Sequence, residues 1–301
     1  MPSSQLERAR IVASFGRQFY VRTLDAPGPD RVAVTRGKRT DFCVGDEVTI
    51  GLIGADQAVI ESGLRRRSEL IRSDRYNVKR LAANVDQAAI VIAADPRFSE
   101  ELLVRMLLAC AHANIPALIL ANKLDLTGPW AAIAPRLQVY RDLGYQVIEL
   151  AVRDHPQETR AALAPVLSGH NTILMGESGM GKSTLVNTLV PGAALATREI
   201  SEALCAGRHT TTFSKWFDLP PESATSGAIV DTPGFQTFGL AHVSESQRVH
   251  AMPEYTELIG QCRFHNCNHV QEPGCAIRAA LENGAIDPIR YLLFSRLSGR
   301  D

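Results

Sequence analysis

The segment Gly176-Glu-Ser-Gly-Met-Gly-Lys-Ser183 decides the fold class of this chain. It fits the pattern G-x-x-x-x-G-K-[ST], in which glycines let backbone N–H groups curl around phosphate oxygens. The apolar run NTILMG leads into it and the run KSTLVNTLV continues as a helix, so the segment joins a buried strand to a helix N-terminus. The sequence therefore predicts a phosphate-binding loop within an α/β sheet.

Two side chains of this loop are expected to act on the phosphates or on their metal ion. Lys182 would reach the β- and γ-phosphates and act in catalysis, and the Ser183 hydroxyl would bind Mg²⁺. Backbone N–H groups would supply the remaining contacts. The expected nucleotide-binding residues of the loop are Gly176, Glu177, Ser178, Gly179, Met180, Gly181, Lys182, Ser183 and Thr184.

A second motif, Asn122-Lys-Leu-Asp125, comes directly after the apolar run ALILA. Ligands of open α/β sheets bind at such carboxyl ends of strands. The carboxylate of Asp125 can accept two hydrogen bonds from guanine N1–H and N2–H₂, whereas adenine has no such pair of donors. With Asn122 and Lys123 it resembles the NKxD motif of GTPases. The motif predicts GTP as the nucleotide, and a P-loop kinase or ATPase is the competing interpretation.

Two further segments are expected to surround the γ-phosphate. Asp231-Thr-Pro-Gly234 follows the apolar run AIV and fits the D-x-x-G pattern, whose Asp lies near Mg²⁺ through water and whose Gly N–H meets the γ-phosphate. The run Gly-Arg-His-Thr-Thr-Thr occupies 207–212, where a GTPase keeps a magnesium-binding threonine. Thr211 is the first candidate for that ligand, and Thr210 is the alternative.

The order of these motifs is unusual, because the guanine motif at Asn122 precedes the phosphate loop instead of following it. A doubly wound sheet tolerates such a rearrangement, since joining nearby termini and cutting one loop keeps the strand pairing. The sequence therefore predicts a circularly permuted GTPase. Phe235 stands where many GTPases place a water-orienting Gln, so we expect slow intrinsic hydrolysis. His209 is the candidate catalytic group, and a loop or RNA-contacting role is its alternative.

The rest of the chain divides around this unit. Residues 11–62 contain short alternating apolar runs separated by Gly and Pro turns, which is typical of a small β-barrel. Residues 64–80 form a polar stretch. Beyond it, nearly continuous apolar runs alternate with helical segments, which predicts a parallel sheet covered on both faces. Residues 241–301 are polar and rich in His and Cys before two expected C-terminal helices.

The formal net charge of the 301 residues is zero, but the charge is unevenly distributed. Residues 1–80 carry 15 basic and 10 acidic side chains, whereas 81–240 carry 11 and 15. A basic first part suits a polyanionic partner. Its clusters are expected to contact RNA phosphates, with a solvated basic surface as the alternative; they contain Arg36, Lys38, Arg39, Arg65, Arg66 and Arg67.

No apolar run is long enough for a transmembrane helix, and the first residues lack the apolar core of a secretory signal. We therefore predict a cytoplasmic protein with no membrane partner.

A cysteine cluster occupies the last part of the chain. Cys262, Cys267, His269 and Cys275 give the spacing C-x4-C-x-H-x5-C. Three thiolates and one imidazole can close a tetrahedral Zn²⁺ site with no open position, so we expect one structural zinc ion. His265 is the alternative imidazole ligand, and a secreted disulfide framework is the competing interpretation.

With its permuted GTPase motifs and this cysteine cluster, the chain resembles the ribosome small-subunit-dependent GTPase A family over nearly its whole length. The resemblance implies an OB-fold RNA-binding domain over 1–75, an α/β circularly permuted P-loop GTPase over 76–240 and a small α-rich zinc-binding domain over 241–301. The chain departs from the family pattern at Glu177, at Met180 and at the base-contacting pair Ala151-Val152.

The same resemblance implies a GTP hydrolase that assists late maturation of the small ribosomal subunit and is stimulated by it. GTP and GDP, the small subunit and its rRNA are the expected partners of a monomer, with Mg²⁺ and one Zn²⁺ as cofactors. It also implies that the histidine of GRHTTT, His209, substitutes for the missing Gln. The alternative function is an OB-fold and zinc rRNA-binding module whose guanine-nucleotide site is not catalytic.

Overall fold

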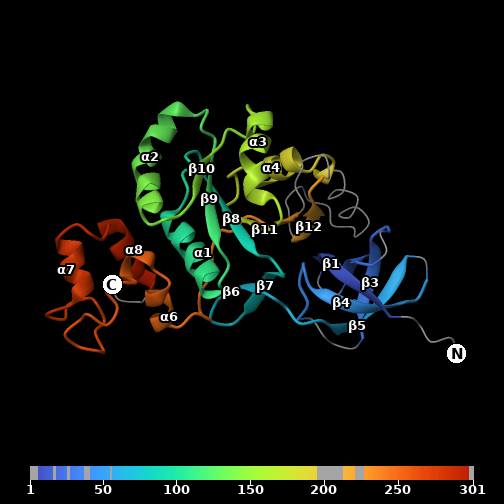
Figure 1. Ribbon diagram of the computed structural model, residues 1–301, viewed down its shortest axis with the longest axis horizontal. Helices are drawn as coiled ribbons and strands as arrows, with labels where there is room; N and C mark the ends of the chain where they lie inside the picture. The colour runs from blue at the N-terminus through green and yellow to red at the C-terminus, as the bar shows by residue number, and fades with distance from the viewer. Residues whose placement is uncertain are drawn as a thin grey trace.

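A computed structural model describes residues 6–15, 18–25, 28–36, 41–54, 56–194, 213–220 and 227–297. The barrel, the central α/β unit and the C-terminal helices follow one another along the longest axis of the molecule, with the α/β unit in the middle (Figure 1). None of the helices in this part of the chain has the length and apolar character needed to span a bilayer.

The N-terminal part is a closed five-stranded barrel, as predicted. Neighbouring strands pair in antiparallel fashion except for the third and fifth, and the first and fourth strands pair to close the sheet. Alternate residues point inward and form a core of their own that includes Ile11, Phe19 and Ile50. The strands are β1 (Glu7–Phe15), β2 (Gln18–Thr23), β3 (Arg31–Thr35), β4 (Glu47–Leu52) and β5 (Gln57–Gly63).

The polar stretch after the barrel is a two-stranded hairpin, which the sequence did not predict. Strands β6 (Glu69–Ser73) and β7 (Val78–Ala83) pair with each other in antiparallel fashion. Strand β6 packs on α1 (Glu100–His112). The domain boundary expected after residue 75 falls inside this hairpin.

The central unit is a sheet whose strands are joined by helices, as the alternating pattern predicts. Its strand order is β10-β9-β8-β11-β13-β12, and the first five strands are parallel. The strands are β8 (Gln87–Ala93), β9 (Ala117–Asn122), β10 (Val147–Glu149), β11 (Asn171–Met175), β12 (Lys215–Asp218) and β13 (Ala228–Asp231). Besides α1, its helices are α2 (Thr127–Asp142), α3 (Pro156–Leu167) and α4 (Lys182–Leu189).

One strand of this sheet corrects the prediction of purely parallel pairing. Strand β12 runs antiparallel to β13, with Trp216 opposite Val230. The two strands are separated only by residues 219–227. A parallel connection needs a crossover of about a dozen residues or more, so this short link forces the antiparallel arrangement. Strand β12 also bridges to β1 of the barrel through Ala13 and Lys215.

Strands β8 and β11 lie side by side at the centre of the sheet, and the chain proceeds from them in opposite directions. Such a topological switch point opens a crevice at the carboxyl ends of the strands, where ligands of doubly wound folds bind. The phosphate loop follows β11, so the fold places it in this crevice.

The C-terminal part consists of short helices that share the apolar core of the central unit. The two expected C-terminal helices are confirmed, and α6 precedes them with a capping box between Ser244 and Gln247. The elements are α6 (Glu245–His250), η2 (Pro253–Tyr255), α7 (Ala276–Glu282) and α8 (Pro288–Leu297).

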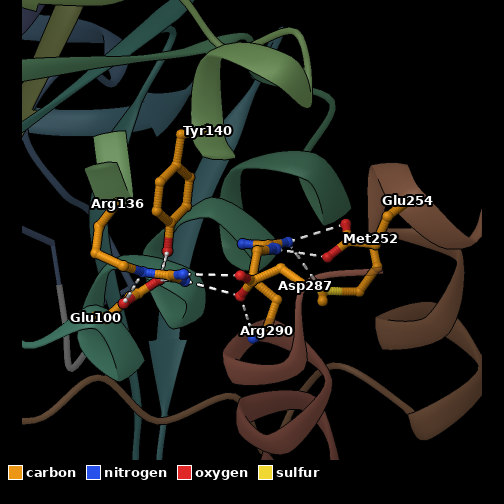
Figure 2. A network of polar contacts seen from close by, with 7 residues as sticks. All are labelled: Glu100, Arg136, Tyr140, Met252, Glu254, Asp287 and Arg290. Carbon is orange, nitrogen blue, oxygen red and sulfur yellow. Dashed lines mark hydrogen bonds and ion pairs between the residues drawn. The ribbon is translucent and has the colours of Figure 1, made fainter. Parts of the chain in front are cut away.

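A network of partly or fully buried ion pairs joins the C-terminal helices to one another and to the central unit (Figure 2). Arg136 of α2 donates to Glu100 of α1 at 2.6 Å and to both carboxylate oxygens of Asp287 at 2.8 Å. Beside it, Arg290 of α8 donates to Glu254 and lies 5.3 Å from the ring centre of Tyr140 on α2. Because these charges are paired and largely removed from water, the loss of one partner would leave the other unsatisfied.

Candidate nucleotide and metal sites

The phosphate loop connects β11 to α4 as a tight curve that depends on its glycines. Gly176 and Gly181 have φ values of 142° and 96°, a region that side chains rarely adopt. A Cβ atom at Gly176 would lie 2.2 Å from the carbonyl oxygen of Val91, and one at Gly181 would lie 2.3 Å from Nδ2 of Asn122. Both positions therefore require glycine, because any side chain would clash with the neighbouring segments.

Asn122 joins three loops of the site. Its Nδ2 donates to the carbonyl oxygen of Met180 at 2.9 Å, and its Oδ1 accepts from the backbone N–H of Val152 at 3.2 Å. The side chain is buried, so both bonds are shielded from water. Asn122 thus ties the phosphate loop to the Ala151-Val152 pair, and Met180 fills apolar space beneath the loop with 2 % exposure.

One continuous cavity of about 920 Å³ brings the three nucleotide motifs together. We call the part lined by Asp125 the guanine end and the part lined by the phosphate loop and the DTPG segment the phosphate end; the volume suits a nucleotide. Its walls are Arg72, Asn122, Lys123, Asp125, Leu126, Arg153, Ser178, Gly179, Gly181, Lys182, Ser183, Thr184, Thr232, Gly234, Gln236 and Thr237.

Two buried groups of opposite charge lie near each other here: Lys182 in the wall of the cavity and Asp231 beside it. Burial lowers the pKa of Lys182 to about 8 and raises the pKa of Asp231 to about 6. The ammonium group of Lys182 donates to the carbonyl oxygens of Gly176 and Glu177 at 2.8 and 2.6 Å. Oδ1 of Asp231 is buried with no hydrogen-bond partner among the described residues. A cation and an unpaired carboxylate oxygen at this place fit the phosphates and the magnesium ion of a bound nucleotide.

The carboxylate of Glu177 accepts from the backbone N–H of Ser99 at 2.5 Å. Ser99 caps α1, whose N-terminus favours negative charge. A carboxylate beside phosphates would otherwise be unfavourable, and this bond explains how the loop accommodates it.

The threonine run between the phosphate loop and β12 lies outside the described residues, so His209, Thr210 and Thr211 remain predictions. Phe235, directly after DTPG, is buried and packs edge to face on Phe238. Its backbone N–H donates to the carbonyl oxygen of Gly176 at 3.1 Å. The residue in the usual place of the water-orienting Gln is thus part of the packing beneath the loop.

The C-terminal cluster brings four metal-ligating side chains together. Donor atoms of Cys262, Cys267, His269 and Cys275 all lie within 4.8 Å of one another. Nδ1 of His269 is 3.6 and 3.5 Å from the sulfur atoms of Cys262 and Cys275, which are 4.0 Å apart. In a tetrahedral site with Zn–S bonds of about 2.3 Å, neighbouring ligands lie about 3.8 Å apart. The cluster could hold a metal ion, and its dimensions fit zinc.

The surroundings of this cluster support thiolate ligands. Backbone N–H groups of Ala276 and Arg278 donate to the sulfur atoms of Cys262 and Cys275, both at 3.4 Å. A sulfur separation of 4.0 Å is far beyond a disulfide bond, which disfavours the disulfide interpretation. His265 is exposed and lies outside the cluster, so the geometry favours His269 as the imidazole ligand.

The arginines predicted to bind RNA, in the barrel and in the segment that follows β5, differ in their exposure and in their ion pairs. Arg65 and Arg67 are exposed, as is Arg36, which pairs with Glu61 at 3.2 Å. Arg66, in contrast, donates to Asp46 at 2.6 Å and to Glu69 at 2.7 Å. Its guanidinium holds the barrel against β6, which makes it the least suited of the group to bind RNA. Lys38 and Arg39 lie outside the described residues.

Sequence reasoning missed Arg72 and Arg153, which line the nucleotide cavity from segments without a motif. It also missed Glu272, whose carboxylate accepts backbone N–H bonds from Asn268, Val270 and Gln271. These bonds hold the pKa of Glu272 at about 2 and order the loop between two metal-ligating residues. Only the position of Glu272 within the cysteine cluster could have indicated such a role.

The fold and the cavity together define the class of the protein: a circularly permuted P-loop GTPase with an N-terminal barrel and a C-terminal cysteine cluster. The chain belongs to the RsgA GTPase family, because the family model for the RsgA GTPase matches residues 63–241. The protein is therefore a GTP hydrolase.

Curated relatives agree over almost the whole chain. A protein of Burkholderia pseudomallei (strain 668), named small ribosomal subunit biogenesis GTPase RsgA, is 48 % identical over 293 residues. These residues cover 97 % of this chain and 92 % of that protein.

Two solved structures share the fold at 24 % identity. YjeQ from Thermotoga maritima gives a TM-score of 0.70 and covers 98 % of both chains. YloQ, described as a circularly permuted GTPase, gives a TM-score of 0.69 and covers 98 % of this chain and 95 % of its own. The permuted order of motifs predicted from the sequence is therefore confirmed.

Proposed function

We propose that this GTPase acts on the small ribosomal subunit, assists its late maturation and is stimulated by it. The observation that carries the proposal is the relative that is 48 % identical over 97 % of the chain and is named for small ribosomal subunit biogenesis. The exposed arginines of the barrel support it, because rRNA presents a dense array of phosphates.

The three expected domains would divide this work. Residues 1–75 would bind rRNA, 76–240 would bind and hydrolyse GTP, and 241–301 would form a zinc-stabilised domain. A cytoplasmic monomer fits a factor that meets assembling subunits one at a time. The division into these three domains and the cytoplasmic location are parts of the proposal.

At the guanine end of the cavity, Asp125 would select the base and Asn122 would support the loops around it. The carboxylate of Asp125 lines the cavity and is the group able to accept from N1–H and N2–H₂ of guanine. Oδ1 of Asn122 accepts from the backbone N–H of Val152 at 3.2 Å. Val152 and Ala151 occupy the position where family members keep a base-contacting pair of small residues. Ala151-Val152 can contact the base through its backbone.

At the phosphate end, Lys182 would neutralise the β- and γ-phosphates, and the N–H of Gly234 would meet the γ-phosphate. Ser183 and Thr211 would hold Mg²⁺, with Asp231 near it through water. When bound, the ion neutralises charge that develops on the phosphate oxygens. His209 would act on the attacking water, since Phe235 has no polar side chain.

Turnover assays with purified ribosomal subunits test the proposed partner. We expect small subunits to accelerate GTP hydrolysis by at least about tenfold, whereas large subunits and ATP give no such increase. Equal stimulation by both subunits would contradict the specific role. Persistent lack of turnover with small subunits would instead favour an rRNA-binding module with a non-catalytic guanine-nucleotide site.

Replacing Asp125 with Asn should weaken GTP binding by about 100-fold, because two charge-assisted hydrogen bonds to guanine are lost. Xanthosine triphosphate should bind the variant better than GTP does, since its O2 can accept from the introduced amide. Titration with fluorescent nucleotides measures both affinities. Asp142→Asn, at the far end of α2, is the matched control. Unchanged GTP affinity in Asp125→Asn would exclude the assigned role.

Reversing the charge at Arg65 and Arg67 together should weaken binding to the small subunit and lower its salt dependence. Each phosphate contact that is lost should reduce the slope of log K against log[salt] by about 0.9 for a duplex, somewhat less for single strands. Arg66 is left intact because it pairs with Asp46 and Glu69. Sedimentation binding over a salt series provides the measurement, with Arg278→Glu on α7 as control. An unchanged slope would remove these residues from the interface.

A further inference from the structure

Arg72 lies in the wall of the nucleotide cavity, although it belongs to none of the GTPase motifs. It comes from β6 of the hairpin and lines the cavity together with Ser178, Gly234 and Gln236. We propose that Arg72 is a catalytic residue of the GTPase reaction, supplying a guanidinium group in cis to the γ-phosphate end of the cavity.

The position of Arg72 along the cavity follows from its contacts. Nη1 donates to the carbonyl oxygen of Thr237 at 3.2 Å, three residues after Gly234. A Cβ atom added to Gly234 would lie 2.9 Å from the backbone nitrogen of Ser178 in the phosphate loop. The segment that accepts from Arg72 is therefore continuous with the backbone that packs on the phosphate loop. This places the guanidinium at the phosphate end.

The aromatic residue after DTPG holds this guanidinium. Cζ of Arg72 lies 5.3 Å from the ring centre of Phe235, within the range of a cation–π contact. Phe238 packs on the same ring at 5.3 Å and fixes its orientation. Phe235, which has no polar group to orient water, thus provides the ring on which the guanidinium of Arg72 packs beside the cavity.

Strand β6 is also bonded to the segment that follows DTPG. The N–H of Ser73 donates to the carbonyl oxygen of Gly239 at 3.0 Å, and the N–H of Ala241 donates to that of Ser73 at 3.1 Å. A Cβ atom at Gly239 would lie 2.1 Å from the Ser73 oxygen, so the close approach requires glycine. Arg72 is therefore coupled directly to the backbone that meets the γ-phosphate.

The reaction needs positive charge at this point. Water attacks the γ-phosphorus, the bond from that phosphorus to the bridging oxygen breaks, and GDP leaves with the bonding electron pair. The proton of the water passes to the released phosphate. Negative charge builds on the equatorial and bridging oxygens during this step, and an arginine supplied to them stabilises it strongly. Arg72 keeps its proton throughout and acts by charge and hydrogen bonding alone.

Arg153, the other arginine that sequence reasoning missed, lines the cavity from the loop after β10 and beside the guanine motif. It directly follows Val152, whose N–H is held by Asn122 of the guanine motif. Arg75 shares the hairpin with Arg72 but lies over the exposed ring of Tyr76 at 5.8 Å and does not line the cavity. It is therefore the matched control.

The test compares single-turnover hydrolysis with nucleotide affinity in the full chain, first without ribosomal subunits. We expect Arg72→Met to slow hydrolysis about 100-fold or more, within the range of removing one positioned donor or cation. GDP affinity should change by less than about threefold, whereas affinity for GDP with magnesium and aluminium fluoride, a transition-state mimic, should fall with the rate. Arg75→Met should behave as the unmodified protein.

Two further variants separate charge from packing. Arg72→Lys keeps the charge and should recover part of the lost rate. Arg72→Gln can still donate to the Thr237 carbonyl but carries no charge, so it should remain as slow as Arg72→Met.

Recovery by Arg72→Gln would overturn the proposal in favour of a positioning role. An equal loss of GDP affinity and rate, or an unchanged rate in Arg72→Met, would overturn it as well. The inference rests on the γ-phosphate position proposed above, but because these assays need no ribosomal partner, their outcome is independent of the proposed action on the small subunit.

Discussion

Replacing Lys182 with Met is expected to reduce GTP turnover by about 10³-fold. The ammonium group is largely buried at the phosphate end of the cavity, where water screens its charge poorly. It now donates to two backbone carbonyl oxygens of its own loop, at 2.8 and 2.6 Å. Phosphate oxygens would replace these acceptors, and their negative charge would make the interaction much stronger.

The same variant should separate nucleotide binding from folding. Burial lowers the pKa of Lys182 to about 8, because removal from water disfavours the charged form. The nucleotide-free variant should therefore melt at the same temperature as the unmodified protein or slightly above it. The rise in melting temperature that GTP and magnesium produce should disappear in the variant.

Turnover and thermal melting should be compared with Lys79→Met, which removes an exposed lysine of β7. That control should keep both turnover and the nucleotide-dependent rise. A Lys182→Met variant with near-normal turnover would show that the loop binds phosphate through its backbone alone. A variant that melts well below the control would show that Lys182 acts in folding.

The sequence predicted those parts of the site whose residues lie close together along the chain. Four residues separate Gly176 from Gly181, and a glycine-rich loop of this spacing between a strand and a helix predicts a phosphate cradle. The guanine motif follows a fully apolar strand, so its position at a strand end could be derived from order along the chain. The permuted order changed the connection of the strands but not their pairing.

The parts that could not be predicted depend on charges that meet across long separations. Arg136 and Asp287 are 151 residues apart, and each would be interpreted from the sequence as a solvated surface charge. Hairpin β6–β7 was overlooked because its alternating residues include several charged ones, such as Arg72, which packs on Phe235, and Arg80, which pairs with Glu69. Arg72 is the clearest case, since its partner Thr237 lies 165 residues away.

Replacing Cys267 with Ser is expected to abolish stoichiometric zinc binding. Structural zinc sites in small domains contribute about 10–16 kcal/mol of apparent binding free energy at neutral pH, and a tetrahedral site that loses one thiolate loses much of it. Zinc should be measured by elemental analysis of the purified chain, where we expect one equivalent. His265→Ala should keep that equivalent, because His265 is exposed and outside the cluster.

Loss of the metal should disorder the cysteine loop before it releases the last helix. We expect the loop to depend on the ion, because residues 261–274 are exposed or only partly buried. Helix α8 has a second attachment through Arg290 and Glu254, whose side chains are 2 % and 5 % exposed, and through Asp287 to Arg136. Hydrogen exchange should therefore rise by orders of magnitude over 262–275 and much less over 288–297.

Cys110→Ser provides the matched control, because Cys110 is a buried thiol of α1 that lies far from the cluster in sequence and takes no part in it. It should retain zinc and keep normal exchange over 262–275. If Cys267→Ser still binds one equivalent of zinc, the cluster is not the site. If it loses zinc and α8 exchanges as fast as the loop, then the ion pairs of Arg290 and Asp287 do not hold the helix independently of the metal.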